Sequence, residues 1–265
     1  MAGRIGLGCG LLAVIAASPA YAQDRSFCAE RPGMGKPACT VGPGQAIIEV
    51  TAIALDHTAE FAGDSDAITF ADTLLRLGLD DTTELQLGVT GYVRTLSPDP
   101  AAMGARLHHG GVGDSYIALR RSLSGAGPIA AIEGYVTLPT GDRAVSAGTW
   151  GAGLVLPIAL PSLGGAALSL TPEVSARPNA SGTGRHLFYG AVLGASGELA
   201  RNLGGALEVA ADQDNAPEGA NFYTVLAGSL AWQASDDLQF NLEVDVDVVA
   251  PTPRTQAFAG FALRL

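Results

Sequence analysis

The sequence predicts an all-β fold: a transmembrane antiparallel up-and-down β-barrel of about 12 strands, preceded by a short N-terminal segment. Three observations favour it. Apolar and polar residues alternate with period two, short and long connections alternate, and charged residues are few. Of the 265 residues, 48% are hydrophobic and 15% are charged. Soluble domains usually carry about a quarter charged residues, so this composition suits an exterior that meets lipid.

The alternation is clearest in residues 238–249. Leucine, phenylalanine and valine fill the even positions, and the odd positions to 247 carry Gln239, Asn241, Glu243, Asp245 and Asp247. Successive side chains of a strand point to opposite faces, so a period of two indicates a strand with one apolar and one polar face. The same pattern and its breaks predict strands along the whole chain. The predicted strands are 44–57, 66–79, 83–95, 113–123, 127–138, 147–157, 164–175, 187–198, 203–213, 221–233, 237–248 and 254–265.

The predicted connections alternate in length. Tight turns are expected at 80–82, 124–126, 161–163, 199–202 and 234–236. Longer loops are expected at 58–65, 96–112, 139–146, 176–186, 214–220 and 249–253. Short turns on one side and long loops on the other are typical of outer-membrane barrels with both termini in the periplasm, and this topology requires an even number of strands.

Strand length separates this barrel from a soluble sandwich or a lipocalin-like barrel, which would also alternate. The predicted strands have about eleven residues, enough to cross a bilayer at a tilt. Phe222 and Trp232 share a face ten residues apart. That spacing corresponds to roughly 25 Å of membrane depth at a tilt of about 40°, which matches an apolar band between two aromatic girdles.

Residues 1–22 are expected to be a secretory signal peptide. Arg4 supplies the positive charge, an apolar run extends to Ala17, and Ala20-Tyr21-Ala22 forms a small-residue cleavage site. A lipoprotein is disfavoured because Cys9 lies before most of the apolar run. Residues 23–265 contain no run of 18 apolar residues, which argues against a membrane-spanning helix.

Residues 23–43 form an N-terminal segment that carries Cys28 and Cys39. An exported chain reaches an oxidising compartment, so we expect these cysteines to form a disulfide. The alternative is a reactive or metal-binding pair, but no CxxC pattern or nearby histidine supports it. The segment could be a periplasmic tether or could fold into the lumen as a plug, and the sequence favours neither. The barrel itself is expected over residues 44–265.

The polar strand faces predict a net-acidic lumen. If the apolar faces meet lipid, the opposite faces line the interior. The charged residues placed there are Glu49, Asp72, Arg76, Glu84, Arg94, Arg120, Glu133, Glu173, Glu208, Asp212, Glu243, Asp245, Asp247 and Arg264. One interpretation is a wet lumen whose charges pair across strands. The other is a cation-favouring constriction, in which carboxylates select by charge.

Two groups within this set carry more specific expectations. Arg76 and Glu84 lie on one hairpin with both side chains inward, which favours a structural ion pair. Glu243, Asp245 and Asp247 place three like charges on one strand face. Like charges repel, so counter-charges or bound cations are expected nearby.

Charge and motifs exclude several other functions. The net charge of −11 argues against nucleic-acid binding, which needs basic patches. No GxSxG motif occurs, and no histidine belongs to a serine-bearing motif. Asp56-His57 with Asp64 and Asp66 could mimic the rim of a barrel protease. We nevertheless expect no catalytic residue, no cofactor and no metal site, and His108-His109 is interpreted as simply polar.

Several short motifs, in order along the chain, resemble a known family. They are Arg-Pro-Gly at 31–33 with Thr-Val-Gly-Pro-Gly at 40–44 and Glu49, the hairpin formed by 74–79 and 84–87, Gly-Val-Gly-Asp at 111–114, and Leu-Pro-Thr-Gly-Asp at 138–142. The chain resembles the bacterial outer-membrane transporter family of the MetA-pathway of phenol degradation. The resemblance covers most of residues 23–265 and implies an outer-membrane channel that admits aromatic or other hydrophobic compounds.

The expected function is therefore an outer-membrane channel for passive passage of small solutes. Its expected partners are the outer-membrane bilayer, the barrel-assembly machinery and a small-molecule solute, with no nucleic acid. The alternatives are an outer-membrane barrel that hydrolyses lipid or peptide and a structural barrel without transport.

Overall fold

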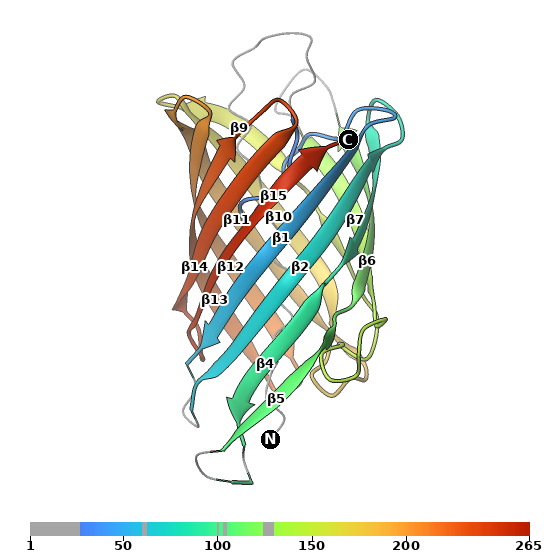
Figure 1. The fold of residues 1–265 in the computed structure, drawn as a ribbon, viewed down its shortest axis with the longest axis vertical. Helices are drawn as coiled ribbons and strands as arrows, with labels where there is room; N and C mark the ends of the chain where they lie inside the picture. Colours follow the sequence, from blue (N-terminus) through green and yellow to red (C-terminus); the bar gives the residue numbers. More distant parts are fainter. Residues whose placement is uncertain (1–26, 60–62, 100, 103–104, 124–129) are drawn as a thin grey trace.

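The computed structural model describes residues 27–59, 63–99, 101–102, 105–123 and 130–265, and these residues form one closed β-barrel (Figure 1). The predicted signal peptide, residues 1–22, lies outside the described residues. Across the described ranges, no helix is long and apolar enough to cross a membrane.

The barrel wall is built from fifteen strand segments. Their bounds are β1 (Ala46–Thr58), β2 (Ser65–Gly78), β3 (Thr83–Val89), β4 (Tyr92–Pro98), β5 (Arg106–Val112), β6 (Ser115–Leu123), β7 (Ala130–Leu138), β8 (Gly151–Val155), β9 (Ile158–Leu163), β10 (Ala166–Pro178), β11 (Arg185–Ala200), β12 (Leu203–Ala216), β13 (Gly219–Gln233), β14 (Leu238–Val249) and β15 (Arg254–Arg264).

The fifteen segments make twelve barrel strands. β3 and β4 both pair with β2 and follow one another as a single broken strand. β5 and β6 form a second broken strand against them. β8 and β9 form a third, since both pair with β7 and β10. β1 pairs with β2 on one side and with β15 on the other, which closes the sheet. The predicted fold class and strand count are confirmed.

The connections keep the predicted two-sided arrangement, with some boundaries moved. The chain end of β15 and the turns 79–82, 164–165, 201–202 and 234–237 lie at one end of the barrel (Figure 1). We call this the turn end and the opposite end the loop end. The turn predicted at 161–163 lies within β9, and the chain reverses at Gly164-Gly165, where both residues have positive φ.

Several predicted loops are shorter because strands continue past the apolar band, whereas the loop before β8 is longer than predicted. β12 and β13 leave only Pro217 and Glu218 between them, instead of the predicted loop 214–220. His108 and His109, predicted in a loop, lie in β5, whereas β8 begins only at Gly151. Beyond the bilayer both faces of a strand meet water, so the loss of alternation does not mark where the strand ends.

The inward and outward faces exchange partway along four neighbouring barrel strands. A bulge separates Thr51 from Ile53 in β1, Ala71 in β2 has a φ of 54°, and β3–β4 and β5–β6 are interrupted at the same level. An added residue shifts the alternation by one position, so all later side chains change face. At the β3–β4 break, a Cβ on Gly91 would lie 1.9 Å from the Phe70 carbonyl oxygen, so only glycine fits there.

This exchange corrects the prediction for Arg94. Uninterrupted alternation from Glu84 would turn Arg94 inward. In the structure, Val93 and Thr95 are the buried residues of β4, and Arg94 is exposed on the exterior. The alternation of apolar and polar residues gave the wrong direction for Arg94, because Thr90 and Gly91 interrupt the strand without an obvious break in that alternation.

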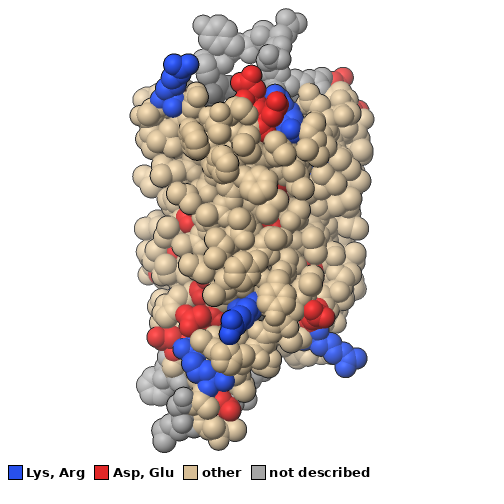
Figure 2. Space-filling model, in the orientation of Figure 1, with Lys and Arg blue, Asp and Glu red and all other residues tan. Residues whose placement is uncertain are grey.

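The exterior is apolar between two charged ends. Figure 2 shows one face on which charged side chains gather near the ends and the middle is largely uncharged. Phe222 and Trp232 are 50% and 52% exposed, near opposite ends of β13. Trp232 stacks on Phe240 of β14, with ring centroids 5.7 Å apart. These aromatic side chains occupy the girdle positions expected of a membrane barrel.

We expect the folded barrel to migrate differently from the boiled protein on a denaturing gel, because a closed hydrogen-bonded sheet resists unfolding by detergent. Gel mobility and far-ultraviolet circular dichroism measure this. Identical mobility together with the absence of a β-sheet signal would contradict the fold.

Candidate functional site: the occupied lumen

Residues 27–43, the described part of the N-terminal segment, lie inside the barrel. We call them the inner segment. Their hydrogen-bond partners come from strands all around the closed sheet: Glu49 on β1, Glu84 on β3, Glu133 on β7, Thr171 on β10, Glu208 on β12, and Gln239 and Glu243 on β14. Only a position within the lumen reaches all of these strands.

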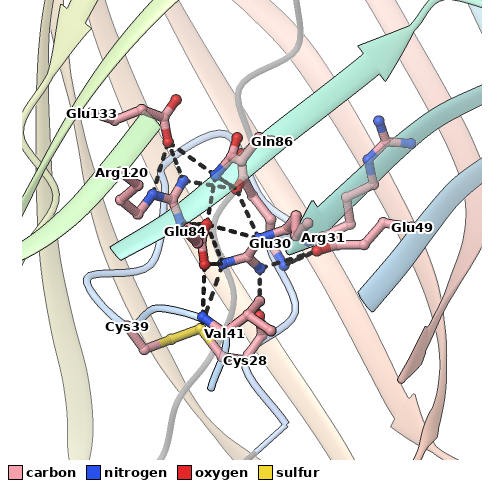
Figure 3. The surroundings of a disulfide bond; sticks show 11 residues. Cys28, Glu30, Arg31, Cys39, Val41, Glu49, Glu84, Gln86, Arg120 and Glu133 are labelled. Atoms are coloured by element: carbon pink, nitrogen blue, oxygen red, sulfur yellow. Dashed lines mark hydrogen bonds and ion pairs between the residues drawn. A yellow bond between two sulfur atoms is a disulfide. The ribbon is translucent and has the colours of Figure 1, made fainter. Parts of the chain in front are cut away.

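The predicted disulfide is present. Cys28 and Cys39 are bonded, with a sequence separation of 11 residues (Figure 3). The Cys28 carbonyl accepts a hydrogen bond from Arg76 Nη1 on the wall. The backbone N–H of Val41 donates to Glu84 Oε2 at 2.7 Å. Both ends of the disulfide loop are therefore attached to the same pair of strands, β2 and β3.

The predicted ion pair between Arg76 and Glu84 is also present, within a larger network. Arg76 Nη2 lies 2.9 Å from Glu84 Oε1, and its Nη1 lies 3.1 Å from Glu49 Oε1. Arg120 on β6 contacts Glu133 Oε2 on β7 at 2.5 Å. The side chains of Arg76, Glu84, Arg120 and Glu133 are 0% exposed. The lumen is therefore packed at this level.

The inner segment supplies two charges that complete this network. Glu30 Oε2 lies 2.7 Å from Arg120 Nη2. Lys36 Nζ lies 3.0 Å from Glu30 Oε1, hydrogen-bonds Glu133, and donates to the Tyr116 hydroxyl at 3.0 Å. Figure 3 shows Glu30 between the wall residues Glu84, Gln86 and Arg120. Each guanidinium or ammonium in the network has more than one carboxylate partner.

Electrostatics keep these two inner-segment groups charged. Burial alone would raise the pKa of Glu30, but the positive charges of Arg120, Lys36 and Arg76 outweigh it and hold that pKa far below its ordinary value of 4.5. Burial alone would lower the pKa of Lys36, but Glu133 and Glu30 raise it above 10.5. A lowered carboxyl pKa stabilises the fold above pH 4.5 and loses that effect only as the pH falls through the lowered value.

On the opposite wall, carboxylates hold the inner segment by its backbone. Glu208 accepts hydrogen bonds from the N–H groups of Met34 and Gly35, at 2.5 and 3.2 Å, and Glu243 accepts one from Gly33. Gly33 has a φ of 120°, a conformation that favours glycine. The turn thereby presents three successive N–H groups to two carboxylates. The positive ends of these N–H dipoles supply part of the compensation for the negative charge of Glu243.

The remaining predicted lumen residues extend from this level toward the loop end. Asp72 pairs with Arg31 of the inner segment at 2.6 Å. Glu173 on β10 accepts a hydrogen bond from the Tyr135 hydroxyl at 2.5 Å. Asp247 accepts one from the Arg254 backbone N–H at 3.1 Å. Within the described ranges, no cationic side chain lies within 4.0 Å of Glu243, Asp245 or Asp247.

Most of the predicted lumen residues therefore line the interior, whereas Arg94 lies outside and Arg264 pairs at the turn end with Asp237, at 2.7 Å. On the wall facing the disulfide lie Glu49, Arg76, Glu84 and Glu133. On the wall of β12 and β14 lie Glu208, Glu243, Asp245 and Asp247. Sequence reasoning missed Glu30, Lys36, Gln86 and Tyr116. One available signal was that Lys36 is the chain's only lysine.

Histidines show no hydrolase arrangement with a serine in the described part of the chain. His57 Nδ1 lies 2.8 Å from Asp66 Oδ1, and His186 Nδ1 lies 2.9 Å from Asn179 Oδ1. Among the same residues, no group of three histidine, cysteine or carboxylate side chains is arranged to hold a metal ion.

Comparison with known proteins places these features in context. The model of the family described as Putative MetA-pathway of phenol degradation matches residues 29–265. The COG4313 outer membrane channel from Pseudomonas putida F1 is similar in structure, with a TM-score of 0.63 and 17% identity over 85% of this chain and 97% of that one. No curated protein matches the chain by sequence.

A second similar structure is the translocator domain of autotransporter NalP from Neisseria meningitidis. Its TM-score is 0.51 and its identity 12%, over 85% of this chain and 90% of that one. At these identities the likeness concerns the fold, an outer-membrane type of barrel.

We expect Glu84→Gln to destabilise the barrel by about 3–5 kcal/mol, because it leaves Arg76 and Arg120 buried with less negative charge. The matched control is Glu198→Gln, which changes an exposed carboxyl near a turn. Urea unfolding of both variants in the same lipid or detergent measures the difference. Equal unfolding midpoints would show that the network contributes nothing to stability.

Proposed function

Because the chain belongs to the family described as Putative MetA-pathway of phenol degradation, we propose that it is a passive outer-membrane channel for small solutes, narrowed by the inner segment. The observation that carries this proposal is a closed barrel whose polar lumen holds an ordered segment of its own chain. A purely structural barrel of this size could fill its lumen with apolar side chains.

The lumen has two levels along the proposed path. Toward the loop end, Asp56, Asp212 and Asp247 are partly exposed and form an acidic vestibule. Toward the turn end, the inner segment is packed against the walls, with Lys36 2% exposed. A solute that enters the vestibule meets the inner segment next. Passage through the channel therefore requires the inner segment to move aside or to rearrange.

The two attachments of the inner segment differ in strength. On the β2, β6 and β7 side it is held by buried ion pairs of Glu30 with Arg76 and Arg120 and of Lys36 with Glu133. On the β12 and β14 side it is held by backbone N–H groups donating to Glu208 and Glu243. Leaving the first wall strips the buried Arg120 of a carboxylate partner, which is costly, whereas leaving the second wall removes only neutral backbone donors from Glu208 and Glu243. We propose that the path opens along β12 and β14, beside Glu243 and Asp245.

The solute class rests on the lumen chemistry and the family. Carboxylates without cationic side-chain partners line β14, which favours cations and neutral solutes over anions. The family's description concerns phenol degradation, so we propose small aromatic compounds among the neutral solutes. The outer membrane is the proposed location, and the barrel-assembly machinery is the proposed route into it.

We expect a cation-favouring reversal potential when the barrel is reconstituted in a planar bilayer under a salt gradient. Neutralising Glu243, Asp245 and Asp247 together, as Glu243→Gln, Asp245→Asn and Asp247→Asn, should weaken that preference because these carboxylates line the path. Arg121→Gln is the control, since this exterior charge at the turn end of β6 should leave the potential unchanged. Hydrolysis of lipid or peptide without conductance would favour a hydrolase. The absence of both conductance and hydrolysis would favour a structural barrel.

We also expect a reducing agent to raise the conductance of the wild-type channel. Reduction of Cys28–Cys39 frees the inner segment, and the added chain entropy weakens its docking. The matched control is the double variant Cys28→Ser, Cys39→Ser. Its conductance should exceed that of the oxidised wild-type channel and should not change when the reducing agent is added. An unchanged wild-type conductance would contradict a gating role for the inner segment.

A further inference from the structure

The exterior of the barrel carries an amphipathic cleft near the loop end, where β1, β2, β4, β5 and β15 meet. Its volume is about 470 Å³. Outward side chains of the five strands line it, because the exchange of faces described above turns them to the membrane side. Figure 2 shows this face, with charged side chains gathered over its lower part.

Strand pairing arranges the outward side chains in rows that run across the wall. Nearest the middle of the barrel, one row contains Ile53, Phe70, Tyr92 and Val112. All four are large, apolar or aromatic, and well exposed. An apolar row with two aromatic rings marks the edge of the hydrocarbon region of a membrane.

The next row toward the loop end is mixed. Ala257, Leu55, Ile68 and Arg94 follow one another across β15, β1, β2 and β4. The row beyond it contains His57, Asp66, Leu96 and His108. The side chains thus change from apolar to charged within about 14 Å along the strands, which is the change expected at a lipid headgroup layer.

Arg94 is the charge in this cleft without a partner. Asp66 is engaged by His57 at 2.8 Å and by Arg106 at 3.1 Å. Asp56, which also borders the cleft, turns its side chain to the lumen, where Gln256 at 3.0 Å and Arg254 at 3.8 Å engage it. Within the described ranges, the Arg94 guanidinium makes no hydrogen bond or ion pair. The Tyr92 hydroxyl lies against Gly110, the cross-strand partner of Arg94, so a second donor stands beside it.

We propose that this cleft binds a phosphorylated glycolipid of the outer leaflet, of the lipid A type. Its phosphate would be held by Arg94 and the Tyr92 hydroxyl, and an acyl chain would lie on Leu55, Ile68 and Leu96. Short turns of outer-membrane barrels face the periplasm, so the loop end lies at the outer leaflet. An arginine presents a planar fork of donors that matches a phosphate group.

Native mass spectrometry of the delipidated barrel in neutral detergent, with added lipid A, tests the proposal. We expect wild type to retain the lipid and Arg94→Gln to lose about tenfold or more in affinity, the scale of a hydrogen bond to a charged group. Arg94→Lys should fall between them. The control is Arg121→Gln, an exterior arginine at the turn end of β6, which should bind as wild type does.

Three results would overturn the proposal. These are equal retention by Arg94→Gln and Arg121→Gln, retention of dephosphorylated lipid as strong as that of lipid A, or competition by inorganic phosphate alone at the lipid's own affinity. Heat-dependent gel mobility of each variant first establishes that it is folded. The channel current does not enter this test, so its outcome is independent of the proposed transport.

Discussion

The structure depends on one electrostatic constraint: two arginines stand on the inner wall where water does not reach. Arg76 and Arg120 are fully buried, and a buried charge is tolerated only when other charges and hydrogen bonds surround it. The wall provides Glu49, Glu84 and Glu133, and the inner segment provides Glu30. The inner segment is thus part of the charge balance of the barrel. The barrel and its contents form one electrostatic unit.

The two walls of the lumen use different chemistry for the same purpose. On one wall, side-chain cations meet side-chain carboxylates. On the other, the carboxylates of Glu208 and Glu243 meet only the partial charges of backbone N–H groups. Among the described residues, this asymmetry leaves Glu243 and Asp245 on β14 without a cationic side chain within 4.0 Å. It also makes the two attachments of the inner segment unequal: charged side chains hold it on one wall and backbone N–H groups on the other.

Alternation was sufficient to predict the architecture but not every side-chain direction. The period of two in residues 238–249 correctly placed Glu243, Asp245 and Asp247 inward, because β14 runs through the bilayer without interruption. It failed for Arg94, since Gly91 marks an exchange of faces that depends on the neighbouring bulge in β1 and on Ala71 in β2. Glu30 and Lys36 could not be assigned, because their partners are brought near only by closure of the sheet. The hairpin pair Arg76 and Glu84 was local, and was therefore predictable.

The place of the inner segment in the chain has a consequence for the order of assembly. It precedes β1, yet its contacts include β12 and β14, and β14 pairs directly with the closing strand β15. Those contacts cannot form until the last strands stand opposite the first. Docking of the inner segment and closure of the β1–β15 seam therefore belong to a single cooperative event. In an unclosed sheet, the N–H groups of the inner segment lack the acceptors Glu208 and Glu243. Closure of the sheet and filling of the lumen are therefore coupled.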